Sequence, residues 1–300
     1  MLGTVLLIAI SGAAGAAHGQ AAGSFVPRFL WNRVPNVQPA DAWRQLVGLV
    51  VDDDGTLFAS DADRASRRVT ARHPDGSAEL LLEGSAACAA PVPGSLPELC
   101  EPGSLALDTG RDRLYVSDRL RDGVFVLNRR GLVSDFLAGV PAAAGLAVGR
   151  DGTLHAASAA DGRLYRFDPQ GAALGSWEVF PPKPGGGNIT GVAIDWEGRL
   201  YVAHGRSTTI RVLTPGGLVA QEIGEDWPPT KILDLAVGPM PGSSQRQFYL
   251  ATSRGLEVFN NKMAEPAVNA VGALGSVAID AGRDQLLAGS LDFGSGFSQV

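Results

Sequence analysis

The chain has 300 residues, of which 45% are hydrophobic, 39 are glycine and 19 are proline. This hydrophobic fraction is enough for a core, and the many glycines and prolines indicate short elements joined by turns, which favours an all-β fold. The formal net charge of −6 at pH 7 argues against a broad surface for nucleic acid or for an anionic membrane, because such surfaces are basic.

The first residues predict a secretory signal peptide. MLGTVLLIAI is apolar, and the small residues of SGAAGAAHGQAAG follow it, as at a cleavage site near Gly19-Gln20. The apolar run is shorter than the roughly 20 residues that a membrane-spanning helix needs. We therefore expect residues 1–19 to be removed and the mature chain to be secreted, or periplasmic in a bacterium, without a transmembrane segment. An uncleaved anchor is the alternative.

A motif that starts at Gly48 recurs along the rest of the chain. Each copy has a small or polar first residue, a short apolar run, a turn and a second apolar run. The six copies are GLVVDDDGTLFASD, SLALDTGRDRLYVSD, GLAVGRDGTLHAAS, GVAIDWEGRLYVAH, DLAVGPMPGSSQRQFYLAT and SVAIDAGRDQLLAGS. Their first residues are 56, 41, 46, 43 and 42 positions apart, a period typical of propeller blades.

Each copy predicts the two inner strands of one blade. The apolar runs are too short for helices, and small residues suit the crowded centre of a propeller. Third strands are expected to start at Arg67, Gly123, Arg163, Thr209 and Leu256, and outer strands at Ala78, Leu132 and Leu218. Four antiparallel strands per copy predict a six-bladed β-propeller, formed as a single domain by residues 24–300.

The two ends of the chain are expected to close the ring together. After the sixth copy only LDFGSGFSQV remains, which is enough for one further strand at most. We expect SFVPRFLW, residues 24–31, to supply the missing outer strand, because this would leave no exposed sheet edge. An incomplete sixth blade is the alternative.

The only two cysteines, Cys88 and Cys100, lie in one insertion between the first and second copies. In an oxidising compartment we expect them to form a disulfide, which would stabilise this loop by about 3 kcal/mol in the chain-entropy model. Two unpaired thiols are the alternative. Neither cysteine has a histidine nearby in the sequence, so a zinc site is not indicated.

Two stretches resemble NHL repeats: ITGVAIDWEGRLYVAHGRSTTIRVLTPGG from Ile189 and GSLALDTGRDRLYVSDRLRDGVFVLNRRG from Gly103. The usual repeat reads Pro-x-Gly-Val-Ala-Val-Asp, a turn, Leu-Tyr-Val-Ala-Asp and an Arg-bearing third strand. The resemblance covers residues 45–290 and implies a six-bladed propeller related in architecture to the gluconolactonase-like family. It does not imply an activity, because the motif consists mostly of core and turn residues.

The related enzyme families imply ligands that this chain lacks at the matching positions. Gluconolactonase-like propellers bind a divalent metal with a Glu at the start of the first blade and an Asp of Pro-Asp-Gly. Here the first blade begins Arg44-Gln45-Leu46, and Ile189-Thr190-Gly191 stands in place of Pro-Asp-Gly. Peptide-amidating lyases bind zinc through channel histidines, whereas His73, His155 and His204 occupy non-equivalent positions. We therefore predict no metal and no cofactor, except under the enzymatic alternative below.

Two other polar features are interpreted as structural. His204 ends a second strand where Asp61 and Asp118 stand in other copies, so it is interpreted as a variant of an aspartate that binds the following turn. The acidic run Asp52-Asp53-Asp54-Gly55 is interpreted as a hairpin turn rather than a calcium site.

The candidate binding residues lie just before the inner strands, because propeller ligands approach the channel mouth. They are Glu101, Asn188, Thr190, Lys231 and Asp234. Asp234 is the most unusual, since the other five copies begin with Gly or Ser. We expect its carboxylate to anchor a ligand, with pairing to Lys231 or backbone amides as the alternative. Asn188-Ile189-Thr190 is also an N-glycosylation sequon, and a glycan there would hinder ligand access.

The sequence therefore predicts a secreted NHL-like propeller that binds a small molecule or a protein partner at the channel mouth. Catalysis is not the favoured interpretation. The alternative is a lactonase- or lyase-like hydrolytic enzyme that uses the central channel, with a divalent metal as cofactor. No nucleic-acid partner is expected.

Overall fold

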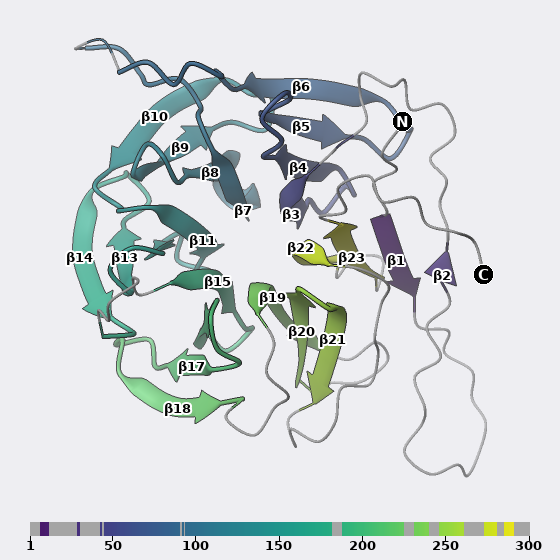
Figure 1. Cartoon of the computed structure of the whole chain (residues 1–300), viewed down its shortest axis with the longest axis vertical. Helices are drawn as coiled ribbons and strands as arrows, with labels where there is room; N and C mark the ends of the chain where they lie inside the picture. The colour runs from purple at the N-terminus through teal and green to yellow at the C-terminus, as the bar shows by residue number, and fades with distance from the viewer. Residues whose placement is uncertain are drawn as a thin grey trace.

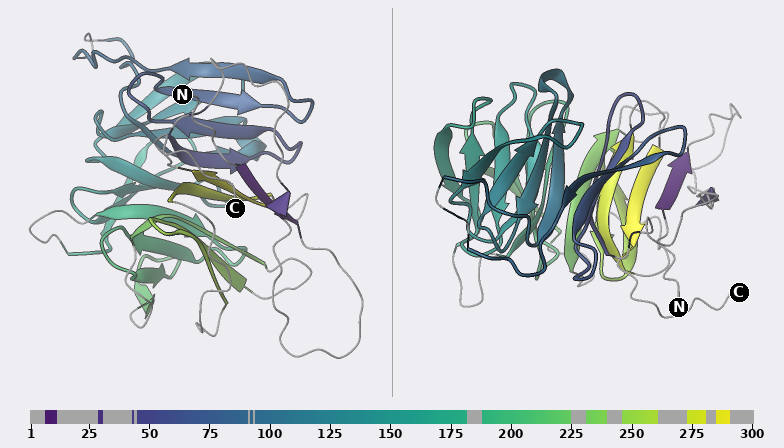
Figure 2. Two further views of the ribbon diagram at one scale, coloured as in Figure 1. Left: turned by 45° about the vertical axis from the view of Figure 1, so that its right-hand side comes forward. Right: turned by 90° about the horizontal axis from the view of Figure 1, so that it is seen from above.

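The chain forms an all-β propeller in the computed structural model. The structure describes residues 7–11, 29–30, 43, 45–90, 92, 94–181, 188–224, 231–239, 246–260, 273–280 and 285–290. Within these ranges the strands form five four-stranded sheets and one three-stranded sheet, all antiparallel, arranged around a centre like the blades of a propeller (Figure 1). The edge view shows the strands running between the two faces of the ring (Figure 2). The predicted propeller of four-stranded antiparallel sheets is confirmed.

The sheets follow one another along the chain, each with its first strand innermost. The first comprises β3 (Leu46–Val51), β4 (Leu57–Asp61), β5 (Arg68–Arg72) and β6 (Ala78–Glu83). The second comprises β7 (Pro102–Asp108), β8 (Arg113–Asp118), β9 (Gly123–Leu127) and β10 (Val133–Ala138). The third comprises β11 (Ala143–Val148), β12 (Leu154–Ser158), β13 (Arg163–Phe167) and β14 (Ala173–Glu178).

The remaining strands form three further sheets. The fourth comprises β15 (Ile189–Ile194), β16 (Leu200–His204), β17 (Ile210–Leu213) and β18 (Val219–Ile223). The fifth comprises β19 (Ile232–Pro239), β20 (Arg246–Thr252) and β21 (Gly255–Asn260). The sixth contains β22 (Leu274–Asp280), β23 (Gln285–Ser290), β1 (Leu7–Ser11) and β2 (Phe29–Leu30), in that order.

The inner strands pack against one another around the centre. β3, β7, β11, β15, β19 and β22 each contact the next, and β22 contacts β3. At Gly145 a Cβ atom would lie 2.9 Å from the backbone N of Val192 in the next sheet, and at Gly191 it would lie 2.9 Å from the backbone N of Leu235. These distances are too short for a side chain. Glycine is therefore needed at these starts because neighbouring backbones approach so closely.

The acidic turns form hairpin connections as expected. Between β15 and β16, Asp195 Oδ1 accepts the backbone N–H groups of Glu197 and Arg199, at 2.9 and 3.0 Å. Gly198 has a φ of 80°, in the left-handed region that favours glycine. The sequence order of carboxylate and then glycine thus matches the needs of the turn.

The residue that ends each of several second strands holds the turn that follows. Asp118 Oδ1 accepts the backbone N–H of Arg121 at 3.1 Å. In the fourth sheet, His204 Nδ1 accepts the backbone N–H of Arg206 at 3.3 Å and lies 3.1 Å from Ser207 Oγ. The same role falls to Asp61, Ser158 and Thr252. These contacts support the structural interpretation of His204.

The predicted disulfide between Cys88 and Cys100 is present. It closes the loop between β6 and β7, which projects from the ring (Figure 1). Arg121 ties this loop to the second sheet, since its Nε donates to the carbonyl of Glu98 at 2.9 Å. The insertion is therefore fastened to the propeller at more than one point.

Both ends of the chain contribute to the sixth sheet. β2 lies within residues 24–31 and is the outermost strand of this sheet. β1 pairs with β23, from Leu7 opposite Gly289 to Ser11 opposite Gln285, although it lies in the segment predicted as a signal peptide. Cleavage after Gly19 would remove β1, so the intact mass of the mature protein distinguishes the two arrangements. No helix in the described ranges is long and apolar enough to cross a membrane.

The role of His204 leads to a stability prediction. Replacement of His204 by alanine removes the acceptor that holds the turn, and should lower the free energy of unfolding by about 1 kcal/mol. His204→Asp restores the acceptor found in the first and second sheets and should retain most of that stability. Urea denaturation of the three proteins measures both effects. Equal losses for the alanine and aspartate variants would contradict this role.

Candidate functional site

The inner strands enclose a central cavity of about 280 Å³. The side chains of its described lining are apolar apart from Ser104 and Asp234, although polar atoms contribute more of its exposed surface than apolar atoms do. The apolar lining residues are Leu49, Val50, Val51, Leu105, Leu107, Leu146, Val192, Ala193, Ile194, Leu235, Ala236, Val237, Val277, Ala278 and Ile279. An apolar cavity with few polar groups is the usual form of a small-molecule site.

Asp234 is held by three hydrogen bonds at the contact between the fifth and sixth sheets. Its Oδ2 accepts from Ser276 Oγ at 2.7 Å and from the backbone N–H of Val277 at 3.1 Å. Its Oδ1 accepts from the backbone N–H of Leu235 at 2.8 Å. A carboxylate has about four acceptor positions, and the described residues occupy one of the two on Oδ1. These partners correspond to the backbone-amide alternative, and an ion pair with Lys231 is not found among the described residues.

The pKa of the Asp234 carboxyl is raised to about 6, chiefly because burial penalises the charged form. The hydrogen bonds from Ser276, Val277 and Leu235 oppose this rise. The residue lies deep among protein atoms yet keeps some accessible surface, which it exposes to the cavity. Asp234 is the only ionisable side chain in the described lining. Its described hydrogen-bond partners are all neutral.

Ser104 occupies the position of Asp234 in the second copy and makes the corresponding contact. Its Oγ accepts the backbone N–H of Leu146 in the next sheet, at 3.2 Å. Asp234 likewise accepts from Val277 of the next sheet. Where other copies have glycine, two sheets meet backbone to backbone; where they have Ser104 or Asp234, a side chain joins them. Asp234 therefore joins the fifth and sixth sheets and also lines the cavity.

The other predicted residues lie near the ends of the inner strands rather than in the cavity lining. Glu101, Asn188 and Lys231 directly precede β7, β15 and β19, so they occupy equivalent places before these inner strands. Thr190 Oγ1 donates to the carbonyl of Ile232 at 2.8 Å and so links the fourth and fifth sheets. The structure does not bring these four side chains together with Asp234. Their ligand-binding role and the glycosylation of Asn188 stay predictions.

The histidines do not converge on a common site. His155 is buried in β12, with its ring centroid 5.9 Å from that of Trp177. Burial, and secondarily the charge of Arg166, lowers its pKa to about 4. His73 Nε2 lies 3.6 Å from Glu79 Oε2. Across the part of the chain that the structure describes, no group of three or more His, Cys, Asp or Glu residues could hold a metal ion.

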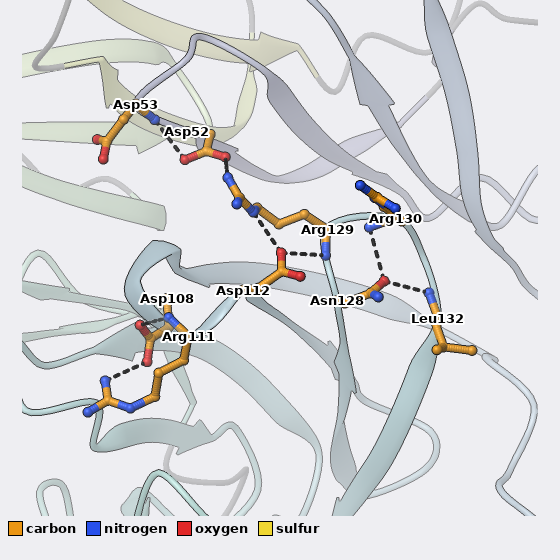
Figure 3. A network of polar contacts seen from close by, with 9 residues as sticks. All are labelled: Asp52, Asp53, Asp108, Arg111, Asp112, Asn128, Arg129, Arg130 and Leu132. Carbon is orange, nitrogen blue, oxygen red and sulfur yellow. Dashed lines mark hydrogen bonds and ion pairs between the residues drawn. The ribbon is translucent and has the colours of Figure 1, made fainter.

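Ion pairs at the ends of the inner strands join neighbouring sheets, and the sequence did not reveal them. Arg129 of the second sheet binds Asp52 of the first sheet and donates through Nε to Asp112 Oδ1 at 2.8 Å (Figure 3). These two carboxylates raise the pKa of the Arg129 guanidinium. Asp52 is almost fully buried, and Arg129 is its ion-pair partner. The repeated Asp at the end of the apolar run was a signal for the carboxylate, but nothing in the sequence indicated Arg129 as its partner.

A similar contact joins the fourth and fifth sheets. Asp195 Oδ2 binds a terminal nitrogen of Arg246 at 2.9 Å and accepts from the hydroxyl of Tyr201, also at 2.9 Å. Asp195 is buried and its acceptor positions are occupied by these and other protein donors. It is therefore a joining residue rather than a free ligand.

No family model matches the chain, and no curated protein matches it. Solved structures do. A gluconolactonase from Xanthomonas campestris aligns with 83% of this chain and 87% of its own, at 17% identity and a TM-score of 0.60. Virginiamycin B lyase from Staphylococcus aureus aligns with 83% of this chain and 96% of its own, at 11% identity and a TM-score of 0.56. Kuenenia stuttgartiensis hydrazine synthase aligns with 81% of this chain and 73% of its own, at 16% identity and a TM-score of 0.56.

These likenesses establish the propeller fold. Their low identities carry no residue-level correspondence. The architectural relation to gluconolactonase-like propellers that the sequence indicated is thereby supported, whereas the NHL repeat stays a prediction.

The raised pKa of Asp234 predicts an unusual pH dependence of stability. Because the folded-state pKa, about 6, exceeds the reference value of 3.8, the native state binds more protons between about pH 4 and pH 6 than the unfolded state. The contribution of Asp234 to stability should fall as the pH rises through this window, by on the order of 2 kcal/mol.

Urea denaturation of the wild type and of Asp234→Asn from pH 4 to pH 7.5 measures this contribution as the pH dependence of their difference. Ser104→Ala is the matched control, since it alters the equivalent contact without removing an ionisable group. Parallel stability curves for the wild type and Asp234→Asn would contradict the assignment.

The buried charge of Asp52 predicts the effect of removing its partner. Arg129→Met leaves this carboxylate without a cation and should lower the free energy of unfolding by about 1–2 kcal/mol. Arg130, the next residue in the chain, is exposed, so Arg130→Met should change the free energy of unfolding little. Denaturation of both variants tests the contrast, and similar losses would show that Arg129 has no special role.

Proposed function

We propose that this protein binds a small, largely apolar molecule in its central cavity, with Asp234 as the polar anchor. The observation that carries the proposal is a single carboxylate among the apolar side chains of the described lining, where its Oδ1 accepts one hydrogen bond from the described residues. The apolar side chains would contact the body of the ligand, while the carboxylate would orient it by one strong hydrogen bond. Propeller channels suit this role because inner strands from every blade contribute to one wall.

The size of the cavity limits the ligand. Small-molecule pockets commonly have volumes of about 300–1,000 Å³, and this cavity, at about 280 Å³, lies near the lower end. A ligand of one small ring or a short chain is therefore proposed, rather than a protein segment. No resident cofactor is part of this proposal.

We also propose that the complete domain is a six-bladed ring closed by its terminal strands. The contact of β22 with β3 and the presence of β1 and β2 beside β23 support this arrangement. Secretion, or export to a periplasm, is proposed as well, and the Cys88–Cys100 disulfide is compatible with an oxidising compartment.

A hydrolytic or lyase activity is the second candidate. The solved neighbours include a gluconolactonase and a virginiamycin B lyase, and a carboxyl with a pKa of about 6 can exchange protons near neutral pH. Hydrolysis of glucono-δ-lactone by the full-length protein, with and without Mg²⁺, Ca²⁺ or Zn²⁺, tests this candidate. Turnover that Asp234→Asn abolishes would support it.

A cavity-filling variant tests the binding proposal. Cyclohexanol is a suitable neutral probe, because it combines a compact apolar ring with one donor. Its binding to the full-length wild type should be detectable by ligand-observed NMR, and Ala236→Leu should abolish it by filling the cavity. Ala138→Leu is the matched control, since Ala138 is exposed on β10. No binding to the wild type, or equal binding to both leucine variants, would overturn the proposal.

A further inference from the structure

We infer that the ligand of this cavity is a cation, namely a primary or secondary ammonium group on a compact apolar body, bound by the Asp234 carboxylate. This inference rests on the proposed function, since it assumes that the central cavity is the binding site. It adds the charge of the ligand, which the fold and its solved neighbours leave open.

The first argument is the missing counter-charge. The described lining contains no Lys, Arg or His, and the described partners of Asp234 are one hydroxyl and two backbone amides, all neutral. A buried carboxylate is costly unless an opposite charge lies beside it. The described residues place no opposite charge beside Asp234, and a cation in the cavity would supply one.

The second argument is that neighbouring strands do not supply the cation. β15 and β22, which pack against β19, present only apolar side chains to the cavity. β20, which also packs against β19, carries Arg246, but this guanidinium binds Asp195 and Glu197 at the end of the fourth sheet. Lys231 precedes β19 and is exposed. β16 also packs against β19 and ends at His204, whose Nδ1 accepts the backbone N–H of Arg206. Arg246 is therefore bound elsewhere, Lys231 faces solvent, and His204 holds its own turn.

The third argument is the geometry of the carboxylate. From the described residues Oδ2 accepts two hydrogen bonds, whereas Oδ1 accepts one. An ammonium group can donate to the remaining position on Oδ1 and gain the attraction of opposite charges as well. A neutral alcohol can make the same hydrogen bond without that attraction. An anion would be repelled, so the site should discriminate by charge.

The structure also predicts how affinity depends on pH. An ammonium ligand stays protonated from pH 5 to pH 7.5, so any change in its affinity over this range reports the protein. Asp234, with a pKa of about 6, is mostly charged at pH 7.5 and mostly neutral at pH 5. Affinity for the cation should therefore rise with pH through this window, and affinity for a neutral probe should not.

Three probes with the same ring test the inference: cyclohexylamine, cyclohexanol and cyclohexanecarboxylate. Binding to the full-length protein is measured by NMR titration at pH 7.5 and pH 5. The wild type at pH 7.5 should prefer the amine to the alcohol by about tenfold or more and should not bind the carboxylate. The preference should shrink several-fold at pH 5 and vanish in Asp234→Asn. Ser104→Ala, which keeps the charge, should retain it.

The outcomes separate this inference from the function on which it rests. Equal affinities for amine and alcohol in the wild type would overturn the cation assignment and leave the binding function standing. An amine preference that survives in Asp234→Asn would also overturn it, because another group would then recognise the charge. Failure of all three probes to bind the wild type would overturn both.

Discussion

The close approach of neighbouring inner strands is the constraint on which the rest of this propeller depends. Where a copy begins with Gly145 or Gly191, a Cβ atom would lie 2.9 Å from a backbone nitrogen of the next sheet. At the same position Ser104 and Asp234 replace this backbone contact by a hydrogen bond across the gap. One position thus decides how each blade meets its neighbour, and in one blade it also brings a carboxylate to the centre.

This constraint explains the character of the cavity. Crowded inner strands favour small and aliphatic side chains, so the side chains of the central lining are apolar apart from Ser104 and Asp234. A charge at the crowded position is both buried and turned toward the cavity. Asp234 therefore joins two sheets and also places a carboxylate in the cavity lining. Its pKa is raised chiefly because it is buried at this position. Ion pairs such as Arg129 with Asp52 join neighbouring sheets at the ends of the inner strands.

Local features of the sequence were sufficient to predict much of the fold. The repeat gave the blades, because the two apolar runs and their turn recur at a regular period. The order of carboxylate and glycine predicted the hairpin turns, and the position of His204 beside equivalent aspartates predicted its contact with Arg206. The disulfide followed from two cysteines in one insertion. Each of these depends on residues close together in the chain or on a repeated position.

Contacts between blades could not be predicted in the same way. Asp52 and Arg129 are 77 positions apart, and no periodic pattern pairs them. Position alone did not separate Asp234, which lines the cavity, from Glu101, Asn188 and Lys231, which lie at the strand ends. The pairing of β1 with β23 was likewise not expected, because an apolar N-terminal run followed by small residues predicts a signal peptide rather than a strand.

Titration of the Asp234 side-chain carboxyl by ¹³C NMR, with and without saturating cyclohexylamine, tests the central claim most directly. The account predicts a midpoint near pH 6 in the free protein and a marked decrease when the amine is bound. A midpoint near pH 4 that the amine leaves unchanged would contradict it.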